Sequence, residues 1–337
     1  MSRLLTGALV VAVLALVALQ VAAPWEHGRT EAAAHPWPVP RQRTAEPRLQ
    51  LGVTTLALAR NANRPWREDD LREVNAFEQD ARHHADTVMW FADWAHNERF
   101  DAGQAALVAA RGSVPEITWE PWDASRGTRQ PRYRLRTIAS GAHDAYVRRW
   151  AREIAAYGGP VRVRFAHEMN AHAYPWAEAV NGNRPGDYVR AWRHVHAIFA
   201  AEGATNVTWV WSPVAGAARA DLYPGSDEVD VIAVSGFNGG TKLFGRRWRS
   251  FADAFGPSLD ALHALDPSKP LELAEVASDG AGGSKAAWID GLFAELRRRP
   301  YVRSLVWFNL RKETDWRIDS SASARRAFAR GVNSATR

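Results

Sequence analysis

Apolar and polar positions follow two alternating periods along the chain. Short runs rich in apolar and β-branched residues, typical of buried strands, are separated by longer segments in which apolar residues recur at helical spacing. Such an alternation is typical of a parallel sheet, and eight strands are what a closed (β/α)8 barrel, or TIM barrel, requires. We therefore predict a single α/β barrel domain over residues 49–330, with strands at 49–54, 86–91, 114–119, 161–165, 206–211, 229–235, 270–274 and 302–308. A doubly wound open sheet is the alternative, although no glycine-rich phosphate turn follows the first strand.

Three of the intervening helices have clear signals. Their apolar faces are Val147, Trp150, Ile154 and Tyr157; Tyr188, Trp192, Val195 and Phe199; and Trp288, Leu292 and Leu296. Gly158 and Gly203 follow the first two faces, where a left-handed residue commonly ends a helix. Asp187 precedes the second face and can cap its first turn.

The N-terminal part of the chain differs from the rest. Arg3 and the apolar run at 4–23 are typical of a secretory signal peptide, or of an uncleaved membrane anchor, because the run is long enough to span a bilayer. Residues 24–48 are rich in Pro and Ala and lack an apolar period, which predicts a linker. We expect a protein that is secreted or anchored to the outer side of the cytoplasmic membrane.

Composition narrows the classes of function. The absence of Cys excludes disulfides, a thiol nucleophile and thiolate metal sites. The 43 Lys and Arg residues against 37 Asp and Glu give a net charge of +6, but the arginines are scattered, so we expect no nucleic-acid partner. The 16 Trp residues exceed what a core requires, and indole rings stack well on sugars.

Two carboxylates finish predicted strands. Glu168 follows the strand at 161–165, and Glu275 ends the strand at 270–274. In a TIM barrel the active site lies at this end of the strands, and glycoside hydrolysis needs one carboxyl group to protonate the leaving oxygen and another to attack or to activate water. The alternative is that Glu168 is only an ion-pair partner of Arg162 or Arg164.

Several motifs resemble those of glycoside hydrolase family 26, which contains β-mannanases and some β-glucanases and β-xylanases. The resemblance covers nearly the whole predicted barrel. The motifs are His167-Glu168-Met169-Asn170 with Tyr174-Pro175-Trp176, Trp209-Val210-Trp211-Ser212-Pro213, Tyr223-Pro224-Gly225, Val229-Asp230-Val231, Glu275, and Trp307-Phe308-Asn309 with Asp315-Trp316.

The resemblance implies a role for each matching residue. Glu168 would be the general acid/base and Glu275 the nucleophile of a reaction that retains anomeric configuration. His167 would position the acid/base, and Trp307 would form a platform under the sugar. One departure affects substrate preference, because Ser235-Gly236-Phe237 stands where the family has Asp-x-Tyr and so lacks a hydroxyl near the nucleophile.

Further candidate substrate-binding residues lie at or just after the strand ends. We include Trp90, Trp119, Trp176, Trp211, Phe237 and Asn170, and expect about half of the tryptophans near the second and third strands to be packing residues. We interpret Glu120 as a supporting residue rather than a catalytic one. The pairs His83–His84 and His194–His196 lack carboxylates at ligand spacing and are interpreted as surface groups, so neither a metal nor another cofactor is implied.

These features predict a retaining, endo-acting hydrolase of a β-linked polysaccharide, with β-mannan as the first substrate to consider. A β-glucanase, a β-xylanase and an enzyme that processes the cell's own exopolysaccharide are alternatives of the same type. A carbohydrate-binding barrel with little turnover is an alternative of a different class. We expect a monomer whose partner is its polysaccharide, with possible membrane anchoring through residues 4–23.

Overall fold

The computed structural model describes residues 48–61, 63–216, 219–243 and 245–336. The predicted signal segment at 1–23 and nearly all of the predicted linker lie outside the described residues. Within these described ranges, no helix is long and apolar enough to cross a lipid bilayer.

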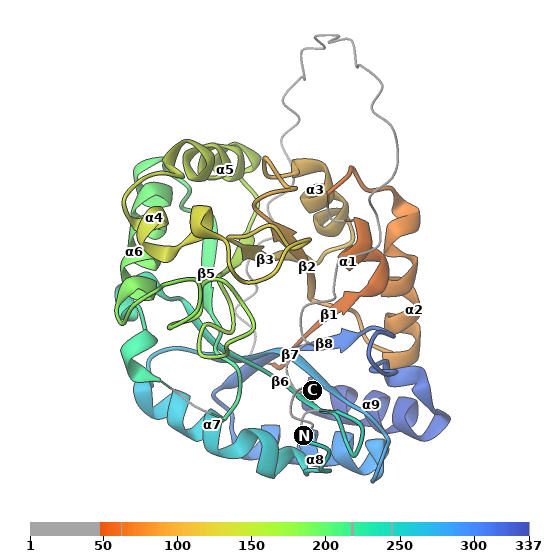
Figure 1. Cartoon of the computed structure of the whole chain (residues 1–337). Helices are drawn as coiled ribbons and strands as arrows, with labels where there is room; N and C mark the ends of the chain where they lie inside the picture. The colour runs from red at the N-terminus through yellow and green to blue at the C-terminus, as the bar shows by residue number, and fades with distance from the viewer. Residues whose placement is uncertain (1–47, 62, 217–218, 244, 337) are drawn as a thin grey trace, which may run out of the picture.

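Eight parallel strands close into a barrel in which each strand pairs with the next and β8 pairs with β1 (Figure 1). Each strand overlaps a run predicted from the sequence, so the (β/α)8 prediction is confirmed. The strands are β1 (Gln50–Thr55), β2 (Thr87–Asp93), β3 (Val114–Glu120), β4 (Val161–Phe165), β5 (Val207–Trp211), β6 (Val231–Asn238), β7 (Leu271–Ser278) and β8 (Val302–Asn309).

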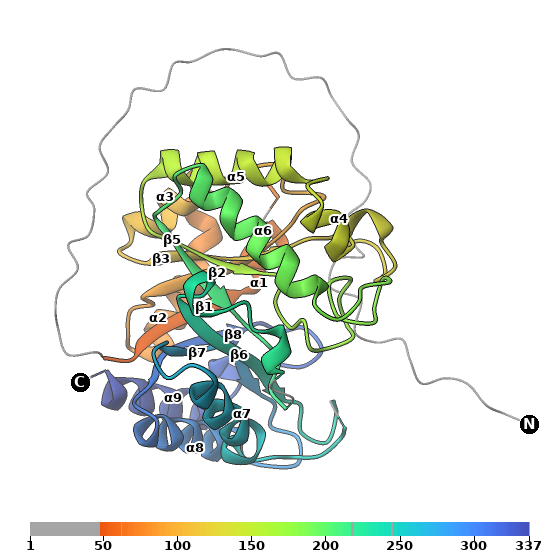
Figure 2. The same cartoon turned by 90° about the vertical axis from the view of Figure 1, so that its left-hand side faces the viewer.

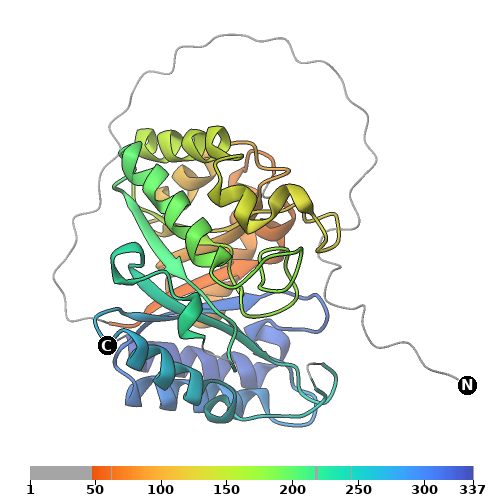
Figure 3. The ribbon, with the colours of Figure 1, turned by 60° about the vertical axis from the view of Figure 1, so that its left-hand side comes forward.

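Helices surround the barrel, with α5 and α6 on one side and α7, α8 and α9 on the opposite side (Figure 2). The helices are α1 (Leu56–Asn61), α2 (Arg72–Ala81), α3 (Ala102–Ala110), α4 (Leu135–Ala139), α5 (Asp144–Tyr157), α6 (Asp187–Ala201), α7 (Phe251–Leu265), α8 (Lys285–Arg298) and α9 (Ala322–Ala335). Short 3-10 helices at Glu68–Leu71, Pro131–Tyr133, Ala220–Leu222, Ser226–Glu228 and Ile318–Ser320 lie in the connections. Because the strands are parallel, the segments that follow them gather at one end, as Figure 3 shows for those after β3, β4 and β6.

The three clearest helix predictions correspond to α5, α6 and α8. Gly158 ends α5 with a φ of 71°, and Gly203 lies just beyond α6 with a φ of 74°, as their positions predicted. The expected cap of α6 is corrected, because Gly186 is the N-cap and Asp187 is the first helical residue. The Asp187 carboxylate instead accepts a hydrogen bond from the backbone N–H of Arg184.

Alternation along the strands divides charged from aromatic side chains. Trp119 of β3 packs against Trp150 of α5 at 5.0 Å between ring centroids, on the helix side of the sheet. Glu116 on the same strand bonds Arg162 of β4 inside the barrel, where Nε lies 2.6 Å from Oε2. Successive residues of a strand point to opposite faces, so polar residues at every second position meet inside the barrel.

A buried group that we call the lower layer consists of Glu116, Arg162, Glu272 and Ser304. Arg162 binds both glutamates, and Ser304 donates a hydrogen bond of 2.5 Å to Glu272. Both glutamate side chains are fully buried. Two carboxylates therefore share one guanidinium in the barrel interior.

Candidate active site

The backbone after β4 places Glu168 at the mouth of the barrel. Ala166 and Glu168 have φ values of 45° and 53°, a left-handed conformation that is uncommon outside glycine. Two hydrogen bonds hold this segment: Ala166 N–H donates to Trp119 O at 3.1 Å, and Glu168 N–H donates to Ser212 O at 2.7 Å. The neighbouring strands β3 and β5 thus fix where the Glu168 side chain starts.

An irregularity in β7 turns Glu275 into the barrel. Glu272 and Glu275 are three residues apart, so a regular strand would place them on opposite faces. The register of β7 shifts against both neighbours, and Ser235 of β6 pairs with Glu275 beyond the shift. Such a bulge re-aims the side chains that follow it, so both glutamates face inward.

Arg164 of β4 binds Glu275 and forms the centre of what we call the upper layer, which also contains Thr118 and Ser235. Its Nη1 lies 2.5 Å from Glu275 Oε1 and 3.1 Å from Thr118 Oγ1, and its Nη2 donates to Ser235 Oγ at 3.2 Å. The guanidinium is fully buried, and these contacts orient one face of the Glu275 carboxylate.

Glu168 and Glu275 lie close together. A carboxylate oxygen of Glu168, a carboxylate oxygen of Glu275 and a ring nitrogen of His167 lie within 4.8 Å of one another. Arg164 already supplies a positive charge to Glu275, so the trio fits a carboxylate pair better than a metal-ligand set. A retaining glycosidase needs its two carboxyl groups about 5 to 5.5 Å apart, whereas an inverting one needs about 6.5 to 9.5 Å.

The environment separates the two acids electrostatically. Burial and the negative charge of Glu275 raise the pKa of Glu168 from 4.5 to about 7, although Arg164 and Ser235 moderate the rise. Glu275 instead receives the direct guanidinium contact from Arg164. Glu168 can therefore hold a proton near neutral pH beside an acid that Arg164 orients.

His167 is an uncharged residue that supports the segment carrying Glu168. It is 1% exposed, and burial together with Arg164 lowers its pKa well below 6.5. Its Nε2 lies 3.1 Å from the hydroxyl of Tyr174, and Trp176 Nε1 donates to its carbonyl at 2.6 Å. The ring next to Glu168 in sequence is thus held in place by the loop that follows it.

Comparison with known proteins relates part of this sequence to a known family. Residues 138–244, which include Glu168, match the model of glycosyl hydrolase family 26. The chain contains a glycosyl hydrolase family 26 domain. It is 36% identical over 270 residues to Endoglucanase H of Acetivibrio thermocellus, covering 77% of this chain and 29% of that protein. It is 28% identical over 109 residues to a β-1,3-xylanase of a Vibrio species, covering 31% of this chain and 22% of that protein.

The solved structures agree with the fold. A family 26 β-mannanase from Bacteroides ovatus superposes with a TM-score of 0.60 at 15% identity, covering 86% of this chain and 90% of that one. The chain spans less than a third of the length of the two sequence relatives, so the names of those proteins describe more than this domain.

Four tryptophans that the sequence placed in the family 26 cleft are packing residues. Trp90, Trp119, Trp211 and Trp307 are each at most 2% exposed. Their ring partners, at centroid distances of 4.8 to 5.1 Å, are Trp66 for Trp90, Trp150 for Trp119, Tyr223 for Trp211 and Phe328 for Trp307. The platform role is therefore wrong for Trp307 in this structure, because α9 covers its ring.

Two further residues that were predicted to bind substrate, Trp176 and Asn170, make contacts that support the loops of the family 26 domain. Trp176 is fully buried and stacks on Tyr174 with ring centroids 4.6 Å apart. Asn170 bonds the backbone of Val214 in both directions, donating at 2.9 Å and accepting at 2.8 Å. Both residues fix the segment that carries Glu168, and the buried Trp176 ring has no exposed face for sugar stacking.

Phe237 is the predicted aromatic residue that does reach the mouth. It is partly exposed and packs against Phe308 and Trp316 at 5.1 and 5.2 Å. The sequence interpretation missed the partner of Arg164, which is Glu275 and not Glu168. The Val-Arg-Val-Arg alternation at 161–164 was the available signal, because it places both arginines on one face of β4.

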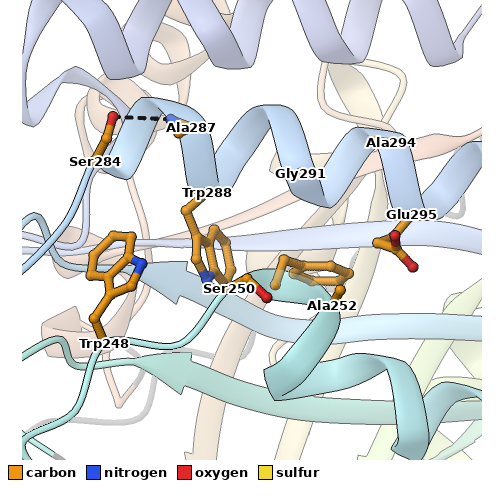
Figure 4. A pocket seen from close by; sticks show the side chains of 10 residues that line it. Trp248, Ser250, Ala252, Ser284, Ala287, Trp288, Gly291, Ala294 and Glu295 are labelled. Atoms are coloured by element: carbon orange, nitrogen blue, oxygen red, sulfur yellow. Dashed lines mark hydrogen bonds between the residues drawn. The ribbon is translucent and has the colours of Figure 1, made fainter.

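The remaining histidines of interest lie away from the mouth. His84 Nδ1 pairs with Glu78 at 2.9 Å, and His194 Nε2 pairs with Asp144 at 2.7 Å. A cavity of about 210 Å³ between the start of α7 and α8 is also separate from the carboxylate pair (Figure 4). Its one acidic lining residue, Glu295, is paired with Arg298 and Arg299.

Proposed function

We propose that the protein is a retaining, endo-acting glycoside hydrolase of a β-linked polysaccharide, with Glu168 as general acid/base and Glu275 as nucleophile. The observation that carries the proposal is the approach of the two carboxylates within 4.8 Å across the mouth of the barrel. This spacing is nearer the separation of about 5 to 5.5 Å in retaining enzymes than the roughly 6.5 to 9.5 Å in inverting ones, which supports retention.

In the first step, protonated Glu168 donates its proton to the glycosidic oxygen as the ionised Glu275 attacks the anomeric carbon. The glycosidic bond breaks and a covalent glycosyl-Glu275 ester forms. In the second step, ionised Glu168 takes a proton from water, which attacks the anomeric carbon and releases Glu275. Two displacements give net retention. The pKa of about 7 for Glu168 suits a group that must donate and then accept a proton.

As substrates we propose β-linked polymers, with β-mannan and β-glucan ahead of β-xylan. The family 26 mannanase fold supports the first, and the relative at 36% identity, named an endoglucanase, supports the second. Phe237 is the residue to examine for the choice, because it lies at the mouth where the family has a tyrosine. A polymer substrate and the predicted signal segment together support action outside the cytoplasm.

Truncating each acid tests the proposal, after the active polymer is identified from mannan, mixed-linkage glucan and xylan. Glu168→Ala should lose activity steeply on the polymer but still form the glycosyl-enzyme from an aryl glycoside, whose leaving group departs without protonation. Glu275→Ala should form no intermediate with either. Azide should give a β-glycosyl azide with Glu168→Ala and an α-glycosyl azide with Glu275→Ala, as read by nuclear magnetic resonance.

Wild-type hydrolysis should release the β-anomer first. Release of the α-anomer, or azide products of the reverse stereochemistry, would show that the mechanism or the roles are wrong. Full activity in both variants would show that Glu168 and Glu275 do not form the active site.

A further inference from the structure

A third acid at the mouth, Glu120, differs from Glu116 on the same strand because no lysine or arginine of the described residues forms a salt bridge with it. Glu116, Thr118 and Glu120 occupy alternate positions of β3 and share the inward face. Glu116 meets Arg162, and Thr118 meets Arg164. In the described part of the chain, the basic group recorded within 4 Å of the Glu120 carboxyl group is the uncharged ring of His167, whose Nδ1 lies 3.9 Å from Oε1.

The groups around Glu120 disfavour its charged form. Asp93 of β2 stands opposite it in register, and Arg164 of β4 and Glu275 of β7 are the other charges that act on it. Glu120 is 6% exposed, and burial, followed by Asp93, raises its pKa from 4.5 to about 8. At neutral pH it is a carboxylic acid, which can both donate and accept a hydrogen bond.

Asp93 does not satisfy this group, because its own carboxylate is already in use. It accepts from His96 Nδ1 at 2.6 Å, from the backbone N–H of Ala124 at 2.9 Å and from Asn97 Nδ2 at 3.2 Å. The Asp93 carboxylate is thus satisfied by groups other than Glu120.

One buried ring nitrogen near Glu120, His167 Nδ1, has no hydrogen-bond partner among the described residues. The indole N–H of Trp122 interacts with the Glu120 carboxyl group and moderates the rise of its pKa, and the Trp122 ring packs against Tyr174 at 5.5 Å between centroids. An unpaired buried polar group is costly, so one that lies beside a binding site points to a polar ligand group that completes it.

We propose that Glu120, acting as an uncharged hydrogen-bond donor and acceptor, binds a hydroxyl group of the sugar unit that meets Glu275. The inference rests on the proposed function, and it changes Glu120 from a supporting residue to a specificity residue. A hydroxyl held by a buried donor–acceptor pair discriminates between sugars that differ at that position. Ionisation of Glu120 would remove the donor and leave a negative charge beside the nucleophile.

Binding measurements at different pH values separate this role from catalysis. In a Glu168→Gln background, which cannot turn over and lacks the titrating acid/base, calorimetry would measure the Kd of an oligosaccharide derived from the polymer that the wild type cleaves. Between pH 6.5 and 9.5, Kd should weaken about tenfold with Glu120 intact and stay constant with Glu120→Gln, which keeps a donor and an acceptor. Glu120→Ala should bind about tenfold more weakly at pH 6.5.

Asp123→Asn is the matched control. Asp123 follows the same strand but is ionised and paired with Arg126, and Ser125 bonds it, so its variant should keep the pH dependence of the parent. Lys285, with a pKa lowered to about 8 by burial, titrates in the same range, and the control retains its contribution.

The inference fails if Glu120→Gln shows the same weakening as the parent, or if folded Glu120→Ala binds as tightly as the parent. Should Glu120→Ala not fold, the pH profile of Glu120→Gln alone decides. A wild type that cleaves no β-linked polymer, with a parent variant that binds none, would instead remove the proposed function and this inference with it.

Discussion

Arg162 and Arg164 lie two residues apart on β4 and point into the same barrel, yet the carboxylates around them meet different surroundings. In the lower layer, Arg162 binds two fully buried glutamates, Glu116 and Glu272. In the upper layer, Arg164 binds Glu275, and the partly exposed Glu168 lies within 4.8 Å of that acid. Both layers place two carboxyl groups near one guanidinium.

What separates the layers is access to the barrel mouth. The charges of the lower layer can be balanced only by other groups in the barrel interior, so their interactions contribute to the free energy of folding. The upper layer leaves Glu168 free to exchange a proton with a substrate or with water, so the same repulsion between acids would serve the proposed catalysis. The comparison teaches that the depth of an arginine and its two acids in the barrel decides whether those acids are accessible for chemistry.

Removing Arg162 should have the largest effect on stability. Arg162→Ala leaves two buried carboxyl groups without their cation, which should reduce the free energy of unfolding by about 3 to 5 kcal/mol. Chemical denaturation at pH 7 measures this loss. The folded fraction should keep kcat within a few-fold, because Arg162 contacts neither proposed catalytic acid.

A compensated variant provides the control for that experiment. Arg162→Met combined with Glu116→Gln and Glu272→Gln removes the charges together and should recover much of the lost stability. If the single variant were as stable as the wild type, or if the triple variant were no better than the single one, the lower layer would not be a charge-balanced unit.

Arg164→Lys should affect catalysis more than folding. A lysine keeps the charge but cannot bind Glu275, Thr118 and Ser235 from a planar fork, so the proposed nucleophile loses its orientation. We expect kcat to fall about 10²- to 10³-fold with a small change in KM, by analogy with the loss of an oriented polar contact in other active sites.

Steady-state kinetics on the active polymer checks this expectation. Arg148→Lys, which alters an exposed pair with Glu202, is the matched control and should leave kcat unchanged. An Arg164→Lys enzyme with wild-type kcat would mean that the upper layer is as structural as the lower one.

The barrel could be predicted from the sequence because its strands carry a strong local signal. The strands are short runs rich in apolar and β-branched residues, even where polar residues alternate with them as in β4, and such runs can be recognised without knowledge of distant residues. The motif around Glu168 and the strand end at Glu275 likewise follow from position along the chain. The start of α6 was less predictable, because Gly186 and Asp187 both suit a helix N-terminus.

It was harder to predict whether a strand residue faces the barrel interior or the surrounding helices. Trp119 and Glu120 are neighbours, yet one packs against α5 and the other faces the barrel. An interpretation based on closeness to the strand end treats both as cleft residues, whereas strict alternation would have separated them. The bulge that turns Glu275 inward depends on pairing with β6 and β8, so the single sequence contains no local signal for it.

The smallest expected effect concerns Glu116, and its sign depends on pH. Burial, followed by the neighbouring Glu272, raises the pKa of Glu116 from 4.5 to about 7. Below pH 4.5 both the folded and the unfolded states hold the proton, so the shift has no effect on stability. Between pH 4.5 and 7 the unfolded state releases a proton that the folded state keeps, so the wild type loses stability as pH rises. Above pH 7 both states are ionised and the loss is constant.

Glu116→Gln removes this titration while preserving the shape of the side chain. Relative to the wild type, the variant should therefore gain stability as pH rises from 4.5 to 7, by about 1 to 3 kcal/mol, and its advantage should then level off. Denaturation curves at pH 4, 5.5, 7 and 8.5 measure the difference, and activity should follow the wild-type pH profile because Glu168 is untouched. A stability difference that does not change with pH would mean that Glu116 has the same pKa in the folded and unfolded states and is ionised in the folded protein at pH 7. Arg162 would then balance both acids, and the lower layer would differ from the upper one in charge state as well as in depth.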